Sequence, residues 1–237
     1  GVDVTLLESH EWLMPRQLDR RASARLERHL AAMGIVLRKE ARSAAIVGDG
    51  HAQGVRLVDG TILPASTVVI ATGVRPNTSL ARKAGLAVNT GIVVDSHMLT
   101  SVPTILAAGD VAEHNGVLYG LWGASLAQGA IAGMNAGGGT VSFGGIPRTS
   151  TLKVLGVDLV SIGQFQPVDG SWVVLADEDD ARLRHFVFHD GVLAGAILMG
   201  DSALAPAVRR AVETRRSFVH LLHGSTLAAD VASALQE

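Results

Sequence analysis

The stretch Val68-Val-Ile-Ala-Thr-Gly-Val-Arg-Pro-Asn77 is the part of the sequence that best indicates the fold. Its first half belongs to a continuous apolar, β-branched run over residues 67–71, which is typical of a strand buried in a parallel sheet. The run breaks at Gly73, where the missing Cβ would let the backbone approach a ligand closely. A buried strand that ends in such a turn favours an α/β fold with a ligand site at the strand's end.

A second stretch, Leu106-Ala-Ala-Gly-Asp110, predicts another strand, over residues 105–110, that ends in an acidic side chain. Ligands bind at the carboxyl edges of strands in open α/β sheets, so Asp110 is a candidate binding residue. A turn or a helix N-cap is the structural alternative for Asp110, and its position alone leaves both interpretations open. A helix rich in Ala and Gly is expected to follow over residues 121–135.

The chain begins with Gly1-Val-Asp-Val-Thr-Leu-Leu-Glu8, an apolar strand that ends in a carboxylate. This pattern is typical of the second strand of a dinucleotide-binding unit, whose terminal Asp or Glu accepts hydrogen bonds from the adenosine ribose. The glycine-rich loop expected about 20 residues earlier is not in the sequence. We therefore expect the downstream part of a longer nucleotide-dependent enzyme. The alternative for Glu8 is a charge in solvent at the end of a strand.

The other elements follow from periodicity and turn residues. An amphipathic helix is expected over residues 19–33, with Gly34 as its C-terminal stop. Short strands with hairpin turns follow at 35–38, 43–47, 55–58 and 61–64, and a further strand at 91–95. After a linker at Gly137-Gly-Gly139, strands are expected at 151–154, 159–162, 172–175, 184–189 and 192–199, and helices near 203–215 and 226–235. We place a domain boundary near residue 140.

One apparent phosphate-binding motif fits its structural context poorly. The segment Gly48-Asp-Gly-His-Ala-Gln-Gly54 loosely matches a glycine-rich dinucleotide fingerprint. That fingerprint binds a pyrophosphate only where a helix N-terminus follows the loop. A strand pattern follows here, so we interpret the segment as a hairpin turn.

Composition excludes several classes of function. The 237 residues carry a formal net charge of −2, few aromatics and no basic stripe, so nucleic acid is not an expected partner. No apolar run reaches the roughly 18 residues of a membrane span, so we expect no membrane association. The chain has no cysteine, which suits a reducing cytoplasm and rules out a thiolate nucleophile or a Cys-ligated metal within it. We expect no metal site, because His185 and His189 are predicted on one strand, roughly 13 Å apart.

The segments VVIATGVRPN and ILAAGDVAEH resemble the second half of the FAD domain in flavoprotein reductases with two dinucleotide folds, the pyridine nucleotide–disulfide oxidoreductase superfamily. A finer resemblance is to NADH–rubredoxin or ferredoxin reductases and to the flavin part of the assimilatory nitrite reductase large subunit. Three stretches carry it, at residues 4–19, 91–135 and 151–163. The resemblance covers nearly the whole chain and is weakest after residue 175.

The resemblance implies an α/β fold made of the rear portions of two Rossmann-like domains and a C-terminal α+β domain. Residues 1–65 would be the rear part of an NAD-binding domain, residues 66–139 the rear part of a FAD-binding domain, and residues 140–237 an interface domain. The implied function is a FAD-dependent NAD(P)H oxidoreductase. Hydride would pass from NADH to FAD, and electrons would then leave to a redox protein or a linked metal-centre domain.

The resemblance also implies roles for particular residues. Asp110 would accept a hydrogen bond from the FAD ribityl chain, and Gly109 would allow the cofactor close approach. A helix starting near Leu121 would direct its N-terminal N–H groups at the flavin pyrimidine edge, where reduced flavin carries negative charge. Glu8 would bind the NAD ribose and repel a 2′-phosphate, which favours NADH over NADPH. The remaining candidates for cofactor contact are Thr72, Gly73 and Val74, where the two nucleotide domains would meet, and Tyr119, Gly120 and Trp122.

Several alternatives stay open at this point. Trp122 is equally well explained as a buried core aromatic. The chain could also be a catalytically empty module that mediates assembly or docking in a larger reductase such as nitrite reductase. A homodimer is among the partners we consider. The sequence identifies neither catalytic residues nor the electron acceptor.

Overall fold

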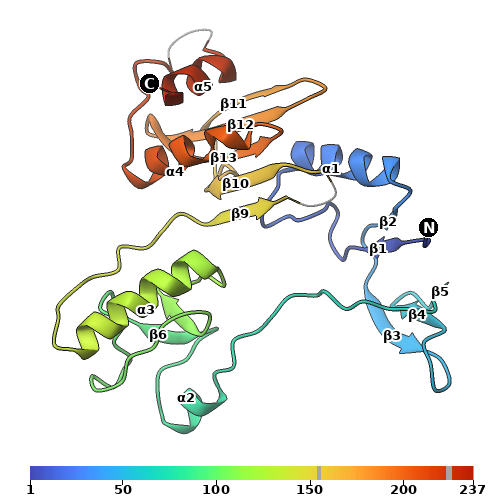
Figure 1. The fold of residues 1–237 in the computed structure, drawn as a ribbon, viewed down its shortest axis with the longest axis horizontal. Coiled ribbons are helices and arrows are strands. Elements are labelled where there is room, and N and C mark those ends of the chain that lie inside the picture. The colour runs from blue at the N-terminus through green and yellow to red at the C-terminus, as the bar shows by residue number, and fades with distance from the viewer. Residues whose placement is uncertain (154–155, 223–225, 237) are drawn as a thin grey trace. The chain divides into compact units, whose positions relative to one another are not determined.

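The computed structural model describes residues 1–153, 156–222 and 226–236. Its contacts divide the chain into two compact units. The first unit comprises Gly1–Ile70 and Pro147–Glu237, and the second unit comprises Ala71–Ile146 (Figure 1). The boundaries predicted at residues 65 and 139 stay predictions.

The first unit is built around a five-stranded antiparallel sheet in the order β11-β12-β13-β10-β9. The strands are β9 (Thr149–Leu152), β10 (Leu159–Gly163), β11 (Val173–Glu178), β12 (Leu183–His189) and β13 (Val192–Met199). β13 lies in the middle of this sheet, and six of its eight residues are buried. Its nearly uninterrupted apolar sequence therefore reflects burial on both faces.

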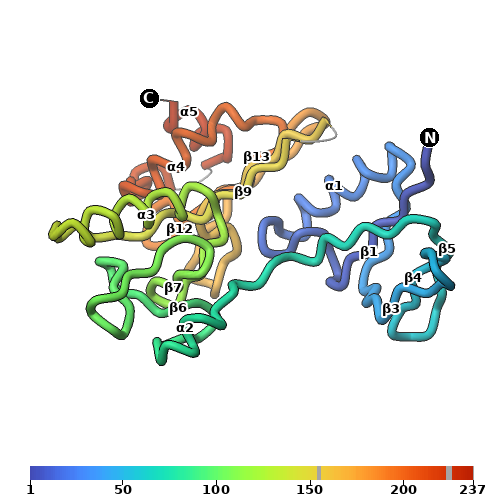
Figure 2. Tube along the Cα trace, turned by 60° about the horizontal axis from the view of Figure 1, so that its bottom comes forward, coloured from blue at the N-terminus to red at the C-terminus, as the bar shows by residue number. Residues whose placement is uncertain are grey.

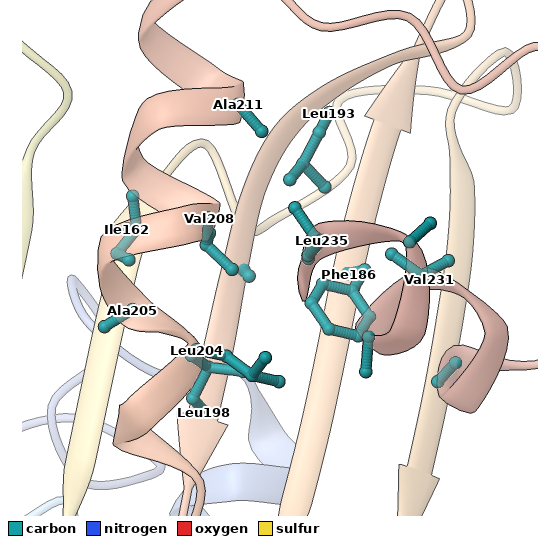
Figure 3. Close-up of a cluster of buried hydrophobic side chains, with 14 of the residues drawn as sticks. Ile162, Phe186, Leu193, Leu198, Leu204, Ala205, Val208, Ala211, Val231 and Leu235 are labelled. Atoms are coloured by element: carbon teal, nitrogen blue, oxygen red, sulfur yellow. The ribbon is translucent and has the colours of Figure 1, made fainter. Parts of the chain in front are cut away.

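Two C-terminal helices cover one face of this sheet (Figure 3). A short 3₁₀ turn, η1 (Ser202–Leu204), leads into α4 (Ala205–Glu213), and α5 (Ala228–Gln236) follows. The cluster between helices and strands includes Phe186, Leu198, Val208, Val231 and Leu235. This arrangement agrees with the α+β pattern expected after residue 140. Val154, the last residue of one predicted strand, lies outside the described residues.

Helix α1 (Arg20–Ala32) packs against other residues of the same sheet. Leu26 and Leu30, four residues apart on one helical face, share a buried cluster with Leu159 and Ile197. The predicted boundaries of this helix are confirmed, because Asp19 is its N-cap and Gly34 follows it with φ +80°. A residue in this left-handed conformation is a common way for a helix to end.

The remainder of the first unit consists of small sheets. Strand β1 (Thr5–Leu7) pairs in parallel with β2 (Val36–Arg38). Three of the four short strands expected to be joined by hairpin turns form an antiparallel sheet, as β3 (Ser43–Val47), β4 (Gly54–Leu57) and β5 (Ile62–Pro64). The fourth, at residues 35–38, is β2 and does not belong to this sheet. A strand, not a helix, follows Gly48–Gly54, which confirms that this segment is a hairpin turn.

The second unit contains α2 (Ser79–Lys83), the three-stranded sheet β6 (Ile92–Val94), β7 (Ala112–His114) and β8 (Val117–Leu118), and the long helix α3 (Trp122–Ala136). β6 and β7 are parallel, whereas β7 and β8 form an antiparallel pair. Val94, Met98, Ala112 and Phe143 form its small core. The helix predicted over residues 121–135 is confirmed as α3.

Two predicted strands are wrong. Residues 67–78 have no regular secondary structure (Figure 1) and follow an extended path (Figure 2). Val69 and Ile70 are 84% and 71% exposed. An apolar run becomes a buried strand only where neighbouring strands pair with it, and none of the described strands does so. Residues 105–110 make a single isolated bridge, at Leu106, and the backbone then turns at Gly109 with φ +84°. The overall expectation of a mixed α/β fold is confirmed.

Candidate functional site

A turn at Gly109 and Asp110 is joined to helix α3 by two side chains of that helix. The backbone N–H of Gly109 donates to Oε1 of Gln128, with a nitrogen–oxygen distance of 2.9 Å. The hydroxyl of Ser125 donates to Oδ1 of Asp110 across 2.8 Å. The structure therefore brings together three sequence-predicted features, namely Gly109, Asp110 and the start of the long helix.

Gly109 is required at this turn by its backbone conformation. Its φ of +84° lies in the left-handed region that side chains disfavour. A Cβ at this position would meet nothing closer than Ser125, at 3.8 Å. Space beside the backbone is therefore open, which suits the close approach of a ligand.

The N-terminus of α3 has no side-chain cap. Leu121 is the N-cap residue, and no side chain of the described residues satisfies the first N–H groups from this position. These groups carry the partial positive charge of a helix N-terminus and can bind an anionic or acceptor group. Gly120, with φ +59°, makes the turn into the helix. Asp110 is not the cap of α3, so the N-cap alternative for this residue is wrong.

Trp122 occupies the first turn of α3 and is 85% exposed. Leu126, one turn later, is 65% exposed. The helix instead buries Ala124 and Gln128 on another face. The alternative interpretation of Trp122 as a core aromatic is therefore wrong in this structure, and contact with a flavin stays a prediction.

Tyr119 precedes the helix and packs within the core of the second unit. Its ring meets that of Phe143 edge to face, with centroids 5.8 Å apart. Its hydroxyl accepts a hydrogen bond from the backbone N–H of Ile146 at 3.4 Å. The structure thus gives Tyr119 a packing role, and a cofactor contact would have to be made in addition.

Thr72, Gly73 and Val74 lie in the segment without regular secondary structure. All three are exposed, and Gly73 has φ +90°. Gly73 thus has a backbone conformation that favours glycine, as expected, but residues 71–78 contain neither the expected turn nor the strand before it. These residues belong to the second unit, as do Gly109 and Asp110.

Glu8 follows strand β1 in the first unit and is engaged with His10. Its Oε1 accepts from the backbone N–H of His10 at 2.9 Å and lies 2.7 Å from Nδ1 of that histidine. Partial burial by itself would raise the pKa of Glu8, but the hydrogen bonds from His10 outweigh it and the pKa is lowered. A free charge in solvent, the alternative for Glu8, is thus not what the structure contains.

The side chains around Gly109 fit a flavin nucleotide. Nε2 of the fully buried Gln128 has no hydrogen-bond partner among the described residues. A buried amide N–H is normally satisfied, so this group needs a partner such as a ligand oxygen or an ordered water. Together with the uncapped helix N-terminus and the carboxylate of Asp110, it provides donors and an acceptor for a polar cofactor. The described residues do not include a glycine-rich phosphate loop that leads into a helix.

Sequence reasoning missed Ser125, Gln128 and Glu113. Ser125 and Gln128 are polar residues three positions apart in a helix otherwise rich in Ala and Gly, a spacing that places them on one face. The carboxylate of Glu113 is buried on β7, where it accepts from the backbone N–H of Gly91 at 2.8 Å and from Nδ2 of Asn89 at 3.1 Å. The Gly91 and Asn89 hydrogen bonds lower the pKa of Glu113.

Neither a metal centre nor a membrane helix is found in the part of the chain that the structure describes. No three His, Asp or Glu side chains there are grouped to hold a metal ion. His185 faces Asp19 and the carbonyl oxygen of Phe165, whereas His189 stacks on Trp172. No described helix is both long and apolar enough to span a bilayer.

Two family models match the sequence. The model of pyridine nucleotide-disulphide oxidoreductases matches residues 1–132. The model of the rubredoxin NAD+ reductase C-terminal domain matches residues 149–216. The first match includes the turn at Gly109 and Asp110 and the start of helix α3, and the second match includes the five-stranded sheet.

Curated relatives share about a third of the residues. The chain is 36% identical over 205 residues to a nitrite reductase [NAD(P)H] of Bacillus subtilis, covering 86% of this chain and 26% of that protein. It is 30% identical over 208 residues to an NADH-rubredoxin oxidoreductase of Clostridium acetobutylicum, covering 88% of this chain and 51% of that protein. The chain therefore spans about a quarter to a half of the length of these relatives.

Solved structures of this kind have the same fold. The NADH:rubredoxin oxidoreductase of Clostridium acetobutylicum superimposes with a TM-score of 0.74 at 28% identity, covering 98% of this chain and 57% of that one. A FAD-dependent pyridine nucleotide-disulphide oxidoreductase of Desulfovibrio vulgaris superimposes with a TM-score of 0.82 at 24% identity, covering 99% and 64%. Because a family model matches more than half of the sequence, the chain belongs to the pyridine nucleotide-disulphide oxidoreductase family.

Proposed function

We propose that the chain is part of a FAD-dependent NADH oxidoreductase that passes electrons to a redox protein or a linked metal-centre domain. The observation that carries this proposal is the turn at Gly109 and Asp110, joined by hydrogen bonds to helix α3. Family membership supports the same cofactor chemistry. FAD, when bound, supplies a group that accepts hydride and can release electrons one at a time.

The chain's own residues would bind and orient this cofactor. Asp110 would accept a hydrogen bond from a ribityl hydroxyl, because its carboxylate is exposed at the turn. The uncapped N-terminus of α3 would stabilise the negative charge that develops on the flavin as it is reduced. Gly109, Gly120 and the open segment from Thr72 to Val74 would allow the cofactor to approach the backbone.

Glu8 would select the nicotinamide nucleotide. A carboxylate at the end of the second strand accepts hydrogen bonds from the ribose hydroxyls and repels a 2′-phosphate. The lowered pKa of Glu8 keeps this group ionised at neutral pH. Ser9 and His10, the next two residues, provide no arginine for a phosphate. NADH is therefore the proposed donor.

The electron acceptor is proposed only by class. The relatives include a nitrite reductase and an NADH-rubredoxin oxidoreductase, whose names indicate different acceptors. Residues 1–237 contain no cysteine, so they supply no disulfide as the acceptor. A separate redox protein or a metal-centre domain of the same polypeptide fits both observations.

The test uses the complete gene product, purified without added flavin. We expect visible flavin absorbance that is bleached by NADH under anaerobic conditions and returns when a one-electron acceptor is added. A protein that holds no flavin, and gains none after incubation with FAD, would instead support the catalytically empty docking module. Bound flavin that NADH does not reduce would overturn the proposed electron donor.

A further inference from the structure

Helix α3 contains two polar side chains that form hydrogen bonds with the turn at Gly109 and Asp110, the proposed cofactor site. Ser125 and Gln128 lie three residues apart, so they present their side chains on the same face of the helix. One contacts the carboxylate of Asp110 and the other the backbone of Gly109. Both ends of this two-residue turn are thus held from a single helix.

The orientation of the Gln128 amide is determined by its partner. The N–H of Gly109 is a donor, so the amide must face it with Oε1, and the reversed amide would place two donors together. Nε2 therefore points elsewhere and has no partner among the described residues, although Gln128 is fully buried. A methionine or leucine would fill a similar volume without burying an unpaired donor.

Ser125 restricts the carboxylate of Asp110 in a complementary way. Its hydroxyl donates to Oδ1. Among the described residues, no second side chain donates to this carboxylate, and Asp110 is exposed, so Oδ2 is available to an outside donor. A carboxylate held by one oxygen presents the other in a defined direction, which lowers the entropy lost when a ligand hydroxyl binds.

We propose that Ser125 and Gln128 are positioning residues that fix the Gly109–Asp110 turn for the flavin nucleotide. This inference rests on the proposed function, since it assigns the turn to that cofactor. Ser125 fixes the rotation of the Asp110 carboxylate, so that its free oxygen has a defined direction. Gln128 holds the left-handed backbone of Gly109 by taking up its N–H, and its own Nε2 remains to donate to the bound cofactor or to a water beside it.

The experiment compares variants of the complete gene product. Ser125→Ala removes the donor to Asp110, whereas Ser125→Thr keeps it. Gln128→Met removes the acceptor for Gly109 at similar volume. Ser233→Ala is the matched control. Ser233 is also a helical serine, and its hydroxyl donates to the carbonyl oxygen of Ala229, but it lies in the first unit.

We expect Ser125→Ala and Gln128→Met to weaken FAD binding by about tenfold, as loss of one hydrogen bond commonly does. The visible spectrum and midpoint potential of the flavin that remains should shift, which a merely structural role would not cause. Ser125→Thr should have the FAD affinity, spectrum and midpoint potential of the unaltered protein. Ser233→Ala should change none of the three. FAD affinity, spectrum and potential that are unchanged in Ser125→Ala and Gln128→Met would overturn this inference while leaving the proposed function intact. An unaltered protein that binds no FAD would overturn the proposed function itself.

Discussion

One carboxylate, that of Asp19, both begins helix α1 and faces His185 in strand β12. Its Oδ1 accepts from the backbone N–H of Ala22 at 2.8 Å, while its Oδ2 lies 3.3 Å from Nδ1 of His185. The other ring nitrogen of the buried His185 lies 3.0 Å from the carbonyl oxygen of Phe165. A residue of the N-terminal segment and a residue of the C-terminal sheet are thereby joined at the start of the helix.

Replacing Asp19 by alanine should destabilise the protein. The variant loses the N-cap of α1, which typically contributes about 1 kcal/mol, and it leaves His185 without its carboxylate partner. Asp19→Asn keeps an acceptor for the N–H of Ala22 and should therefore lower the unfolding free energy by less. Urea unfolding followed by circular dichroism measures both changes.

Thr78 provides the control for Asp19. It is the N-cap residue of α2, but its side chain makes no capping hydrogen bond. Thr78→Ala should therefore change the unfolding free energy by less than Asp19→Ala does. An Asp19→Ala variant that is no less stable than Thr78→Ala would contradict the role assigned to the cap and the His185 contact.

Glu178 should contribute to stability through its three arginine partners. Its carboxylate lies 2.9 Å from Arg21, 3.3 Å from Arg25 and 3.0 Å from Arg28, all on α1. Burial alone would raise the pKa of Glu178, but these guanidinium groups outweigh it and the pKa is lowered. Glu178→Gln should lower the unfolding free energy by about 1 kcal/mol, and less in high salt, because salt screens exposed charges.

Glu11→Gln is the matched control for this charge cluster. Among the described residues, Glu11 forms an ion pair with Arg20 alone, and both side chains are more than half exposed. Glu11→Gln should leave the unfolding free energy nearly unchanged, because isolated surface ion pairs usually contribute little to stability. A Glu178→Gln variant that is no less stable than Glu11→Gln would contradict the role of the cluster.

Glu8 should determine the preference for NADH. Glu8→Ala combined with Ser9→Arg removes the acceptor for the ribose hydroxyls and adds a partner for a 2′-phosphate. Loss of a hydrogen bond to a charged group corresponds to about a 10- to 100-fold change, which should appear in kcat/KM for NADH relative to NADPH. Stopped-flow reduction of the bound flavin by each nucleotide provides the measurement. Faster reduction of the unaltered enzyme by NADPH would show that the assignment of Glu8 is wrong.

Local patterns predicted the elements that depend on nearby residues. Helix α1 has both its apolar spacing and its end signals within the sequence, at Asp19 and Gly34. The β3–β4 hairpin follows from its glycine turn in the same way. Residues 67–71 behave differently, because their apolar character predicts a strand only if other strands flank them. Whether such neighbours pair with a run is a property of the fold and cannot be read from the run itself.

The candidate site was predictable in part for a similar reason. Gly109 and Asp110 stand in a motif that resembles a family pattern, so their positions could be inferred. Ser125 and Gln128 gain their significance only from the turn that faces them. The two hydrogen bonds join residues that are 15 and 19 positions apart in the sequence. A polar pair on an Ala- and Gly-rich helix was the available signal.

Asp110→Ala should lower FAD occupancy without unfolding the protein. Asp110 is exposed, so its removal leaves no cavity, but the cofactor would lose a hydrogen bond to a charged acceptor. Such a loss corresponds to about a 10- to 100-fold weaker affinity. Flavin retained after dialysis, measured by absorbance, tests this. Asp49→Ala, at an exposed turn carboxylate, is the control, and equal retention in both variants would mean that Asp110 acts only in the turn.

The last prediction concerns Glu113 and pH. Its hydrogen bonds from Gly91 and Asn89 lower its folded-state pKa below its value in the unfolded chain, about 4.3. Such a group stabilises the fold at pH values above the unfolded pKa, and this contribution is lost as the pH falls through the folded pKa. Glu113→Gln has no carboxylate to titrate. The difference in unfolding free energy between the unaltered protein and this variant should therefore be constant near pH 7 and shrink below about pH 4.3.

Comparing the two proteins at each pH cancels the contributions of the other carboxylates whose pKa values are lowered. Hydrogen exchange of the Gly91 amide adds a local measurement, because this N–H donates to Glu113 across 2.8 Å. It should exchange faster in Glu113→Gln at pH 7, since a neutral acceptor holds it less strongly than a carboxylate does. Stability curves that stay parallel from pH 7 to pH 3, with unchanged exchange at Gly91, would show that the buried carboxylate contributes nothing specific to the fold.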